Sequence, residues 1–514
     1  MKTFKNNCLI AFILPLLLLV GMPVQAKAPN IVFILADDLD KELFTHSLKI
    51  NSLIAMHGIK FDNNFVSISL CCPSRATLLK GQYAHNTGIF TNSPPKGGFP
   101  IAYANGLEKS TVATWLQSAG YRTALLGKYL NGYPSINSGQ NYVPPGWSYW
   151  LSPNSGQPYS EYNYSLNENG KTVNYGNTDA DYLVDVLSKK AAKFIKNNTT
   201  HHPDKPFFLY IAPYIPHLPS TPPSRYANDF PGLKAPRSAS FNEANIRDKI
   251  KWLQAKPLLT DAQIVNIDTL YRKRRQSMQA VEDLVENQIN TLQALGELDN
   301  TYVIFSSDNG FHQGQHRLNS GKDTAFEEDI KVPLLVRGPG VPVGATVFEM
   351  TANVDLAPTL AEIAGVKIPA FVDGRSLMPF LKGQKPLLWR KALLLEHRHP
   401  SAINKSTSGL LEPQDPHDII TQTTNSKASG FNSIPPVFVG LRTDNQAIGL
   451  NGPITYIEYD TGERELYDLS ADPLQLNNKY STTKPALRSK LRAWLASLAY
   501  ASGQSIREAE QTSP

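Results

Sequence analysis

Short apolar runs rich in β-branched residues alternate with longer segments of helical periodicity through most of the chain. The runs are short enough for buried strands, and the clearest are 31–35, 123–126, 207–211, 302–305 and 332–336. The helical segments are 110–119, 179–195, 268–295 and 354–364, and a glycine follows three of them, where helices commonly end. This alternation predicts an α/β domain with a largely parallel sheet between helices, and ligands at the carboxyl ends of its strands.

Two stretches have no clear period. Residues 132–176 are rich in Tyr, Asn, Gly, Pro and Ser, and we expect a long surface loop that shapes a substrate pocket. Residues 401–436 are rich in Ser, Thr, Asn and Pro, and we expect a linker, with a pocket rim as the alternative. The end of the chain predicts a small antiparallel sheet with a closing helix, from segments at 437–441, 447–450, 455–458, 465–467 and 485–498.

The beginning of the chain has the pattern of a secretory signal peptide. Lys2 and Lys5 precede an apolar run at 9–20, and Val24-Gln25-Ala26 suits a signal peptidase. The run is shorter than the roughly 20 residues that span a bilayer, so cleavage is favoured over an uncleaved anchor. We therefore expect an exported protein, periplasmic or secreted, that does not span a membrane. Its expected parts are the signal peptide at 1–26, a large catalytic domain at 27–385 and a smaller α+β subdomain at 386–514.

The charge balance is only mildly basic. The chain has 50 lysines and arginines and 44 acidic residues, and loss of Lys2 and Lys5 with the signal leaves an excess of four basic residues. So small an excess does not indicate nucleic-acid binding. It suits an anionic substrate if some of it lines a cleft, and ordinary surface charge is the alternative.

The number and spacing of the cysteines indicate that one of them has a chemical role. Cys8 lies in the signal segment, which leaves only the adjacent pair Cys71 and Cys72. A disulfide framework needs more cysteines, farther apart, and neighbouring cysteines bridge each other only with strain. One member of the pair is therefore expected to have a chemical role, although a small buried hydrophobe is the usual fate of a free cysteine.

Acidic residues follow two of the predicted strands. Asp37 and Asp38 end the first, and Asp308 and Asn309 follow the apolar strand expected at 301–307. Adjacent carboxylates repel each other unless a cation lies between them. A solvated loop or a helix cap would explain the first pair alone, but the second pair favours a cation. Oxygen ligands without a thiolate or imidazole cluster favour calcium or magnesium.

The most specific motif is the segment from Cys71 to Gly81, which reads Cys-Cys-Pro-Ser-Arg-Ala-Thr-Leu-Leu-Lys-Gly. It matches the signature Cys-x-Pro-Ser-Arg-x-x-x-Leu-x-Gly at every fixed position, and on this segment the chain resembles the type I sulfatases. The resemblance implies an alkaline-phosphatase-like fold with a mixed, mainly parallel sheet. It also implies oxidation of Cys71 to formylglycine by a formylglycine-generating or sulfatase-maturing enzyme. The hydrated aldehyde would then supply the nucleophile.

The resemblance also assigns the other site residues. Asp37, Asp38, Asp308 and Asn309, with the formylglycine at Cys71, would hold calcium, with magnesium as the alternative. Asp308 would also help to deprotonate the hydrated aldehyde. The remaining candidates are Arg75, Lys128 and Lys322 for sulfate, His217 and Lys322 for the departing alcohol, and His316 as a further substrate contact. Taken alone, His217 could be structural and Lys322 an ordinary surface lysine.

The segment Gly127-Lys128-Tyr129-Leu130-Asn131 narrows the substrate. Many arylsulfatases have a histidine where this chain has Leu130, and the segment resembles the N-acetylglucosamine-6-sulfatase and endosulfatase branch. The resemblance implies hydrolysis of a sulfate monoester on a sulfated carbohydrate, with an aryl sulfate as a surrogate. The alternatives are a phosphate or phosphonate monoester hydrolase and a non-catalytic carbohydrate-binding relative. Residues 464–473 resemble the tail segment of many sulfatases.

Overall fold

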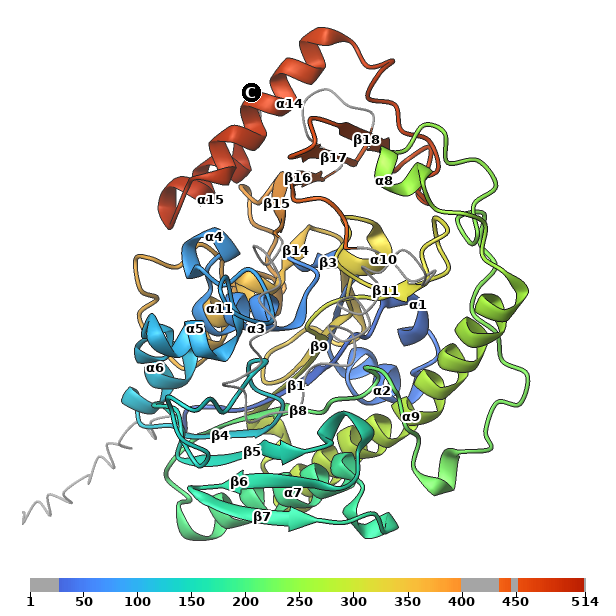
Figure 1. Cartoon of the computed structure of the whole chain (residues 1–514). Helices are drawn as coiled ribbons and strands as arrows, with labels where there is room; N and C mark the ends of the chain where they lie inside the picture. Colours follow the sequence, from blue (N-terminus) through green and yellow to red (C-terminus); the bar gives the residue numbers. More distant parts are fainter. Residues whose placement is uncertain (1–26, 399–433, 445–451, 513–514) are drawn as a thin grey trace, which may run out of the picture.

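The computed structural model describes residues 27–398, 434–444 and 452–512 (Figure 1). The signal peptide expected at 1–26, most of the linker expected at 401–436 and the segment at 447–450 lie outside the described residues.

A ten-stranded sheet forms the centre of the molecule (Figure 1). Five neighbouring strands in its middle run parallel, which confirms the predicted α/β class. These strands, in sheet order, are β9 (Thr301–Ser307), β1 (Asn30–Ala36), β8 (Phe207–Ala212), β4 (Arg122–Gly127) and β5 (Tyr149–Gly156). The sheet is mixed because β12 (Leu334–Arg337) runs antiparallel to β9, with β2 (Ile59–Phe61) and β13 (Ala345–Val347) beyond it.

Successive side chains of β1 point to opposite faces of the sheet, so this strand helps to build two cores. Ile31, Phe33 and Leu35 pack with the helices α3 (Cys71–Lys80), α6 (Val112–Ser118) and α11 (Leu356–Ile363). Val32 and Ile34 pack with α7 (Leu183–His201) and α9 (Asp261–Ala294). Helices therefore cover both faces, and the continuous apolar run of β1 is the pattern of a strand buried on both sides.

The expectation of a loop at 132–176 is wrong. This stretch contains β5 and the hairpin of β6 (Tyr164–Glu168) and β7 (Lys171–Tyr175), which extend the main sheet to its edge. Polar composition hid the hairpin because β7 is partly exposed along its length. Its turn is Asn169-Gly170, with φ of +50° and +87°, the two-residue turn that Asn-Gly favours.

The predicted C-terminal antiparallel sheet is confirmed. It consists of β15 (Ala392–His397), β16 (Phe438–Thr443), β17 (Ile454–Tyr459) and β18 (Arg464–Asp468), closed by α14 (Pro485–Ala499) and α15 (Gln504–Gln511) (Figure 1). Leu394, Tyr456 and Trp494 share one core with Phe65 and Phe326 from the large domain. The small sheet is thus packed against the main body.

Buried charges join the last helix to the large domain. Glu510 of α15 accepts from Tyr83 and pairs with Arg375, and its carboxylate lies 3.0 Å from Nε of Arg390. Arg390 in turn binds both oxygens of Asp355, at 2.6 and 2.8 Å. Because buried ions are costly unless paired, this network favours one position for α15.

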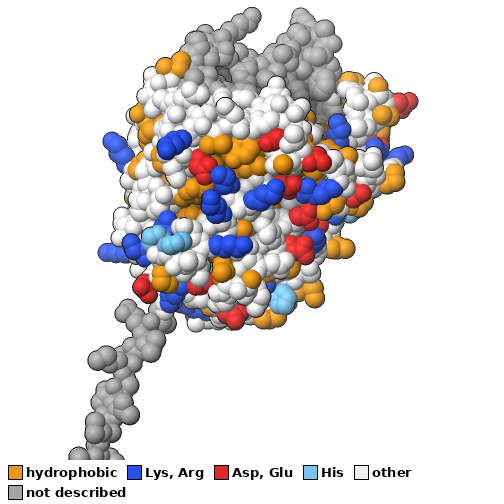
Figure 2. Space-filling view, turned by 90° about the horizontal axis from the view of Figure 1, so that it is seen from below, with side chains coloured by type: hydrophobic (Ala, Val, Ile, Leu, Met, Phe, Trp, Pro, Cys, Tyr) orange, Lys and Arg blue, Asp and Glu red, His pale blue; other side chains and the backbone are white. Residues whose placement is uncertain are grey.

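The surface is mixed in charge. On the face shown in Figure 2, basic side chains lie among acidic ones and small apolar areas. Within the described part of the chain, no helix is long and apolar enough to cross a membrane.

Candidate active site

Four neighbouring parallel strands bring the predicted residues to one edge of the main sheet. Asp37 and Asp38 follow β1, and Asp308 and Asn309 follow β9. Lys128 follows β4, and His217 lies shortly after β8. Because the carboxyl ends of parallel strands meet at the same edge, residues distant in sequence become neighbours there.

The signature segment forms α3 (Cys71–Lys80), and several of its fixed residues have a structural reason. Cys71 is the first helical residue, and Pro73 lies in the first turn, where a missing N–H costs least. Leu79 is buried in the core. The helix ends at Gly81, which has φ of +66°, and an added Cβ would lie 2.9 Å from Val372. Only glycine suits both the conformation and the space.

Three carboxylates and three basic side chains meet around Cys71. Lys128 Nζ lies 2.6 Å from Asp37 Oδ2, and Lys322 Nζ lies 2.7 Å from Asp38 Oδ1. Arg75 Nε donates to Asp308 Oδ2 at 2.8 Å, and its Nη1 donates to the Lys128 carbonyl at 3.1 Å. All six side chains are almost fully buried. The set is therefore neutral as a whole, although each charge has been removed from water.

Burial and neighbouring charges set the ionisation of the three acids. Burial opposes the charge of Asp38, but Lys322, His217 and Lys128 together outweigh it and hold its pKa far below the usual range. The pKa of Asp37 is also lowered, because Lys128, His217 and Arg75 together outweigh burial. Burial raises the pKa of Asp308 to about 6, even though Arg75 acts in the opposite direction. A cation beside Asp308 would favour its charged form.

The donor set fits a cation. One ligand atom each from Asp37, Asp38, Cys71 and His217 lies within 4.8 Å of the others, and all four residues are buried. Asn309 is in the same cluster, because its Nδ2 donates to Asp38 Oδ1 at 2.7 Å. Oδ2 of Asp38 and Oδ1 of Asn309 receive no hydrogen bond from the described residues. Buried oxygens of this kind call for a bound ion or water.

Cys71 is poorly suited to act as a thiolate. Its Sγ lies 2.8 Å from Lys322 Nζ and 3.3 Å from Asp37 Oδ1. Burial, followed by the charge of Asp37, raises the pKa of the thiol well above its usual value. The thiolate is the reactive form of cysteine, so burial disfavours the reactive form of an unmodified Cys71. Cys72 is also buried, and neither cysteine forms a disulfide.

Two tyrosines that the sequence analysis missed line the site. Lys128 Nζ lies 5.0 Å from the ring centre of Tyr159 and 5.5 Å from that of Tyr214. The Tyr159 ring also lies 4.8 Å from the ring of His217. The Leu218 carbonyl accepts from His217 Nδ1 at 2.7 Å, which directs Nε2 toward Asp38 Oδ2, 3.5 Å away. Tyr159 therefore contacts a cation and a histidine of the cluster at once.

Arg274 of α9 (Asp261–Ala294) is a third residue that was missed. Its guanidinium is buried, donates to the Asp38 carbonyl and to Gln313, and lies 2.9 Å from Asp40 Oδ2. The sequence does contain a pattern that indicates a buried role for Arg274. Arg274 occupies the same helical stripe as Tyr271, Met278 and Val281, which are all buried. A charged residue on an apolar stripe indicates a buried partner.

His316 is the one predicted site residue whose contacts lie elsewhere. It is buried, its Nδ1 lies 2.7 Å from Glu243 Oε2, and its ring stacks on Phe326 at 3.9 Å. The structure thus brings together Asp37, Asp38, Cys71, Arg75, Lys128, His217, Asp308, Asn309 and Lys322. The proposed contact of His316 with substrate stays a prediction.

Comparison with known proteins agrees with this arrangement. The sulfatase family model matches residues 29–366. The N-acetylglucosamine-6-sulfatase of Capra hircus is 36% identical over 501 residues, which cover 95% of this chain and 86% of that protein. An extracellular sulfatase SULF-1 homologue of Drosophila melanogaster is 36% identical over 378 residues, 72% of this chain and 33% of that longer protein.

The fold has a solved counterpart. A protein known in complex with its substrate D-glucosamine-2-N,6-O-disulfate superposes with a TM-score of 0.71 at 23% identity, over 91% of this chain and 97% of that one. That likeness concerns the fold. The family match and the identity to the caprine enzyme go further, and on them the chain belongs to the sulfatase family and is a sulfatase.

Proposed function

We propose that this sulfatase hydrolyses the sulfate monoester of a sulfated sugar, with a formylglycine made from Cys71 and one bound divalent cation. The observation that carries the proposal is the position of Cys71. Its Sγ lies at the start of α3, within 3.3 Å of both Lys322 Nζ and Asp37 Oδ1, and burial with the charge of Asp37 disfavours a thiolate there against the effect of Lys322. Oxidation by a maturing enzyme would convert the thiol into an aldehyde, whose hydrate would be the nucleophile. Asp308 would help to remove a proton from this hydrate.

Asp37, Asp38, Asp308 and Asn309, with the oxidised Cys71, would hold the cation. Calcium suits this oxygen set, and magnesium is the alternative. When bound, the cation would withdraw charge from the sulfate oxygens, and the hydrated aldehyde would supply the attacking oxygen and later release sulfate.

The charge count supports an anionic substrate. The three carboxylates balance Arg75, Lys128 and Lys322, so a divalent ion would leave two positive charges in a buried site. The two lysines, now paired with Asp37 and Asp38, would then be available to the sulfate oxygens. Fixed cations in a site removed from water stabilise charge that develops on oxygen during the reaction.

The contacts of His217 support a role for it as proton donor to the departing alcohol. The Leu218 carbonyl fixes its Nδ1 at 2.7 Å and the Tyr159 ring packs against it, so Nε2 faces the cluster. Lys322 is close enough to Cys71 to assist, at 2.8 Å. We assign leaving-group protonation to these two residues.

The sugar half of the substrate rests on the relatives. The caprine relative is named for N-acetylglucosamine 6-sulfate, and the structural neighbour binds a glucosamine disulfate. Leu130 is buried beside Lys128, in the segment that resembles that branch. Export to the periplasm or the medium is supported by the pattern of residues 1–26 and by the extracellular relative.

The test compares two esters of one alcohol, N-acetylglucosamine 6-sulfate and N-acetylglucosamine 6-phosphate. The matured enzyme should have the higher kcat/KM on the sulfate ester, and Cys71→Ala should abolish turnover while it preserves the fold. A higher kcat/KM on the phosphate ester would identify a phosphate monoester hydrolase instead. Sugar binding without turnover of either ester, with Cys71 still a thiol, would identify a non-catalytic relative.

A further inference from the structure

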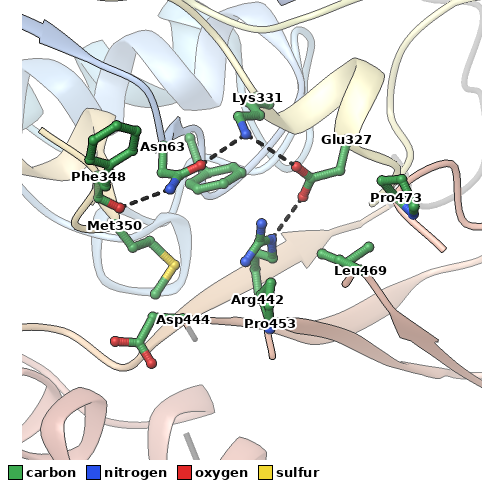
Figure 3. Close-up of a pocket in the computed structure, with 11 residues that line it drawn as sticks. Asn63, Glu327, Lys331, Phe348, Met350, Arg442, Asp444, Pro453, Leu469 and Pro473 are labelled. Atoms are coloured by element: carbon green, nitrogen blue, oxygen red, sulfur yellow. Dashed lines mark hydrogen bonds and ion pairs between the residues drawn. The ribbon is translucent and has the colours of Figure 1, made fainter. Parts of the chain in front are cut away.

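A hollow of about 230 Å³ lies where the large domain meets the C-terminal sheet (Figure 3). We call it the seam pocket. Its walls come from β3 (Asn64–Phe65), from the segment that follows β13, from α10 (Glu327–Ile330) and the residue after it, and from β16. Its lining shares no residue with the candidate active site.

One wall of the seam pocket carries two cations that share a carboxylate. Arg442 Nε lies 2.8 Å from Glu327 Oε1, and Lys331 Nζ lies 3.8 Å from Glu327 Oε2. Lys331 also donates to Asn63 Oδ1 at 2.9 Å. Figure 3 shows these groups directed toward one another. One carboxylate on this wall therefore serves two cations, and Asp444 adds the second carboxylate of the lining.

These cations are largely removed from water. The side chains of Arg442 and Lys331 are 7% and 15% exposed, and both lie over the buried ring of Phe65, at 4.7 and 5.5 Å. Burial lowers the pKa of Lys331 to about 8, against the effect of Glu327. An anionic group brought to this wall would meet a field that water screens poorly.

The rest of the lining includes apolar side chains and a second carboxylate. Phe348 and Met350 lie together on another side of the pocket, and the Phe348 side chain is 67% exposed (Figure 3). Asp444 lies away from the Lys331–Glu327 pair and adds a hydrogen-bond acceptor. The pocket thus offers an aromatic face, a cationic wall and an acceptor, the mixture of apolar lining and few polar groups that fixes a small ligand.

A sugar unit with one acidic group matches all three features. Its carboxylate or sulfate would face Arg442 and Lys331, a hydroxyl would donate to Asp444, and the apolar face of its ring would pack on Phe348. Pockets for drug-sized ligands measure about 300 to 1,000 Å³, so this smaller volume suits one sugar unit.

We propose that the seam pocket is a second, non-catalytic binding site for an anionic sugar unit. The choice of a sugar rests on the proposed function, whereas the site itself rests on its own lining. It would allow the enzyme to hold a glycan at a point other than the scissile ester.

The test measures binding without turnover, on Cys71→Ala protein, so that it does not depend on sulfatase activity. Methyl glucuronide is the probe for a carboxylate, methyl glucoside 6-sulfate the probe for a sulfate, and methyl glucoside the uncharged control. Affinities would be measured by ligand-observed saturation-transfer NMR. The pocket variants are Lys331→Gln and Phe348→Ala, and Lys322→Ala is the active-site variant. Val343→Ala is a matched control because Val343 is 74% exposed and lies outside the pocket.

At least one anionic probe should bind more tightly than methyl glucoside. The anionic probe with the higher affinity identifies the acid group that the pocket prefers. Lys331→Gln and Phe348→Ala should each weaken binding of this probe about fivefold or more, which is roughly 1 kcal/mol, and Val343→Ala should not. Equal binding of charged and uncharged sugars, unchanged affinity in both variants, or loss of binding only on Lys322→Ala would overturn the proposal. Failure here leaves the ester comparison unaffected, so the two proposals can fail separately.

Discussion

Arg274 donates from Nη2 both to the backbone carbonyl of Asp38 and to Oδ2 of Asp40, the latter at 2.9 Å. Asp38 has φ of +63°, the left-handed region that non-glycine residues seldom occupy. Such a conformation costs on the order of 1 to 3 kcal/mol and persists only where surrounding contacts hold it. Helix α9 therefore fixes the backbone of a proposed cation ligand.

Replacement of Arg274 by methionine should weaken calcium binding by about 10- to 100-fold, the usual effect of losing a residue that orients metal ligands. Isothermal titration of calcium into the metal-depleted protein measures it. The double variant Arg274→Met/Asp40→Asn removes the unpaired charge that the single variant leaves at Asp40. The double variant should therefore be more stable than Arg274→Met alone. Lys273→Met, on the exposed side of the same helix, is the control. Unchanged calcium affinity in the double variant would contradict this role.

Tyr159 is predicted to position Lys128 and His217 through its ring rather than its hydroxyl. Tyr159→Phe should retain most of kcat/KM, since it keeps the ring that contacts Lys128 and His217 and removes the hydroxyl, whose contact with Asn131 Nδ2 is as long as 3.3 Å. Tyr159→Leu should lose on the order of 10- to 30-fold, because a desolvated cation–π contact contributes about 2 kcal/mol. Steady-state kinetics decides, and equal losses in the two variants would point to the hydroxyl instead.

Glu108 should make stability depend on pH. Burial raises its pKa to about 7, although Tyr129, next to Lys128, and Tyr142 donate to it. In the unfolded chain its pKa is about 4.3, so between these values the folded protein binds the extra proton. Stability therefore falls as pH rises from about 4.3 to about 7 and is constant above that range.

The variant Glu108→Gln has no carboxyl group at this position, so its side chain does not ionise. Relative to the wild type, its free energy of unfolding should rise by about 3 kcal/mol between pH 4 and pH 8, as an upper value. Thermal unfolding at several pH values measures the difference. A difference that stays constant with pH would show that Glu108 ionises as freely as in solvent.

The last helix is predicted to be part of the stable core. Glu510→Gln leaves Arg375 and Arg390 with too little negative charge and should cost about 3 to 5 kcal/mol of unfolding free energy. Glu508→Gln, an exposed neighbour on α15, should have little effect. Urea unfolding compares the two, and equal stability would mean that the buried network contributes nothing.

Much of this site could be predicted because the informative residues are adjacent in sequence to apolar strands. Asp37, Lys128 and Asp308 each follow a run that is buried on both faces, so strand order alone brings them together. The signature at Cys71 is local and complete. Pro73, Leu79 and Gly81 serve helix geometry and core contacts, and Cys71 and Arg75 belong to the site itself, which is why a short motif could identify it.

What the sequence concealed depends on contacts between distant segments. Tyr159 lies in a stretch whose composition suggested a loop, and the Asn169-Gly170 turn was the available sign of a hairpin. Arg274 lies in a correctly predicted helix, but its partner Asp40 is more than two hundred residues away. The pairing of His316 Nδ1 with Glu243 is equally non-local, and nothing near His316 in the sequence indicates it.

The central claim is that Cys71 becomes the nucleophile by oxidation, and mass spectrometry of the peptide that contains it tests this directly. The protein should come from its native host and be active on a sulfate ester. The account predicts an aldehyde at Cys71 in place of the thiol, and an unchanged Cys72. An intact thiol at Cys71 in fully active protein would contradict it, and the nucleophile would have to be sought elsewhere.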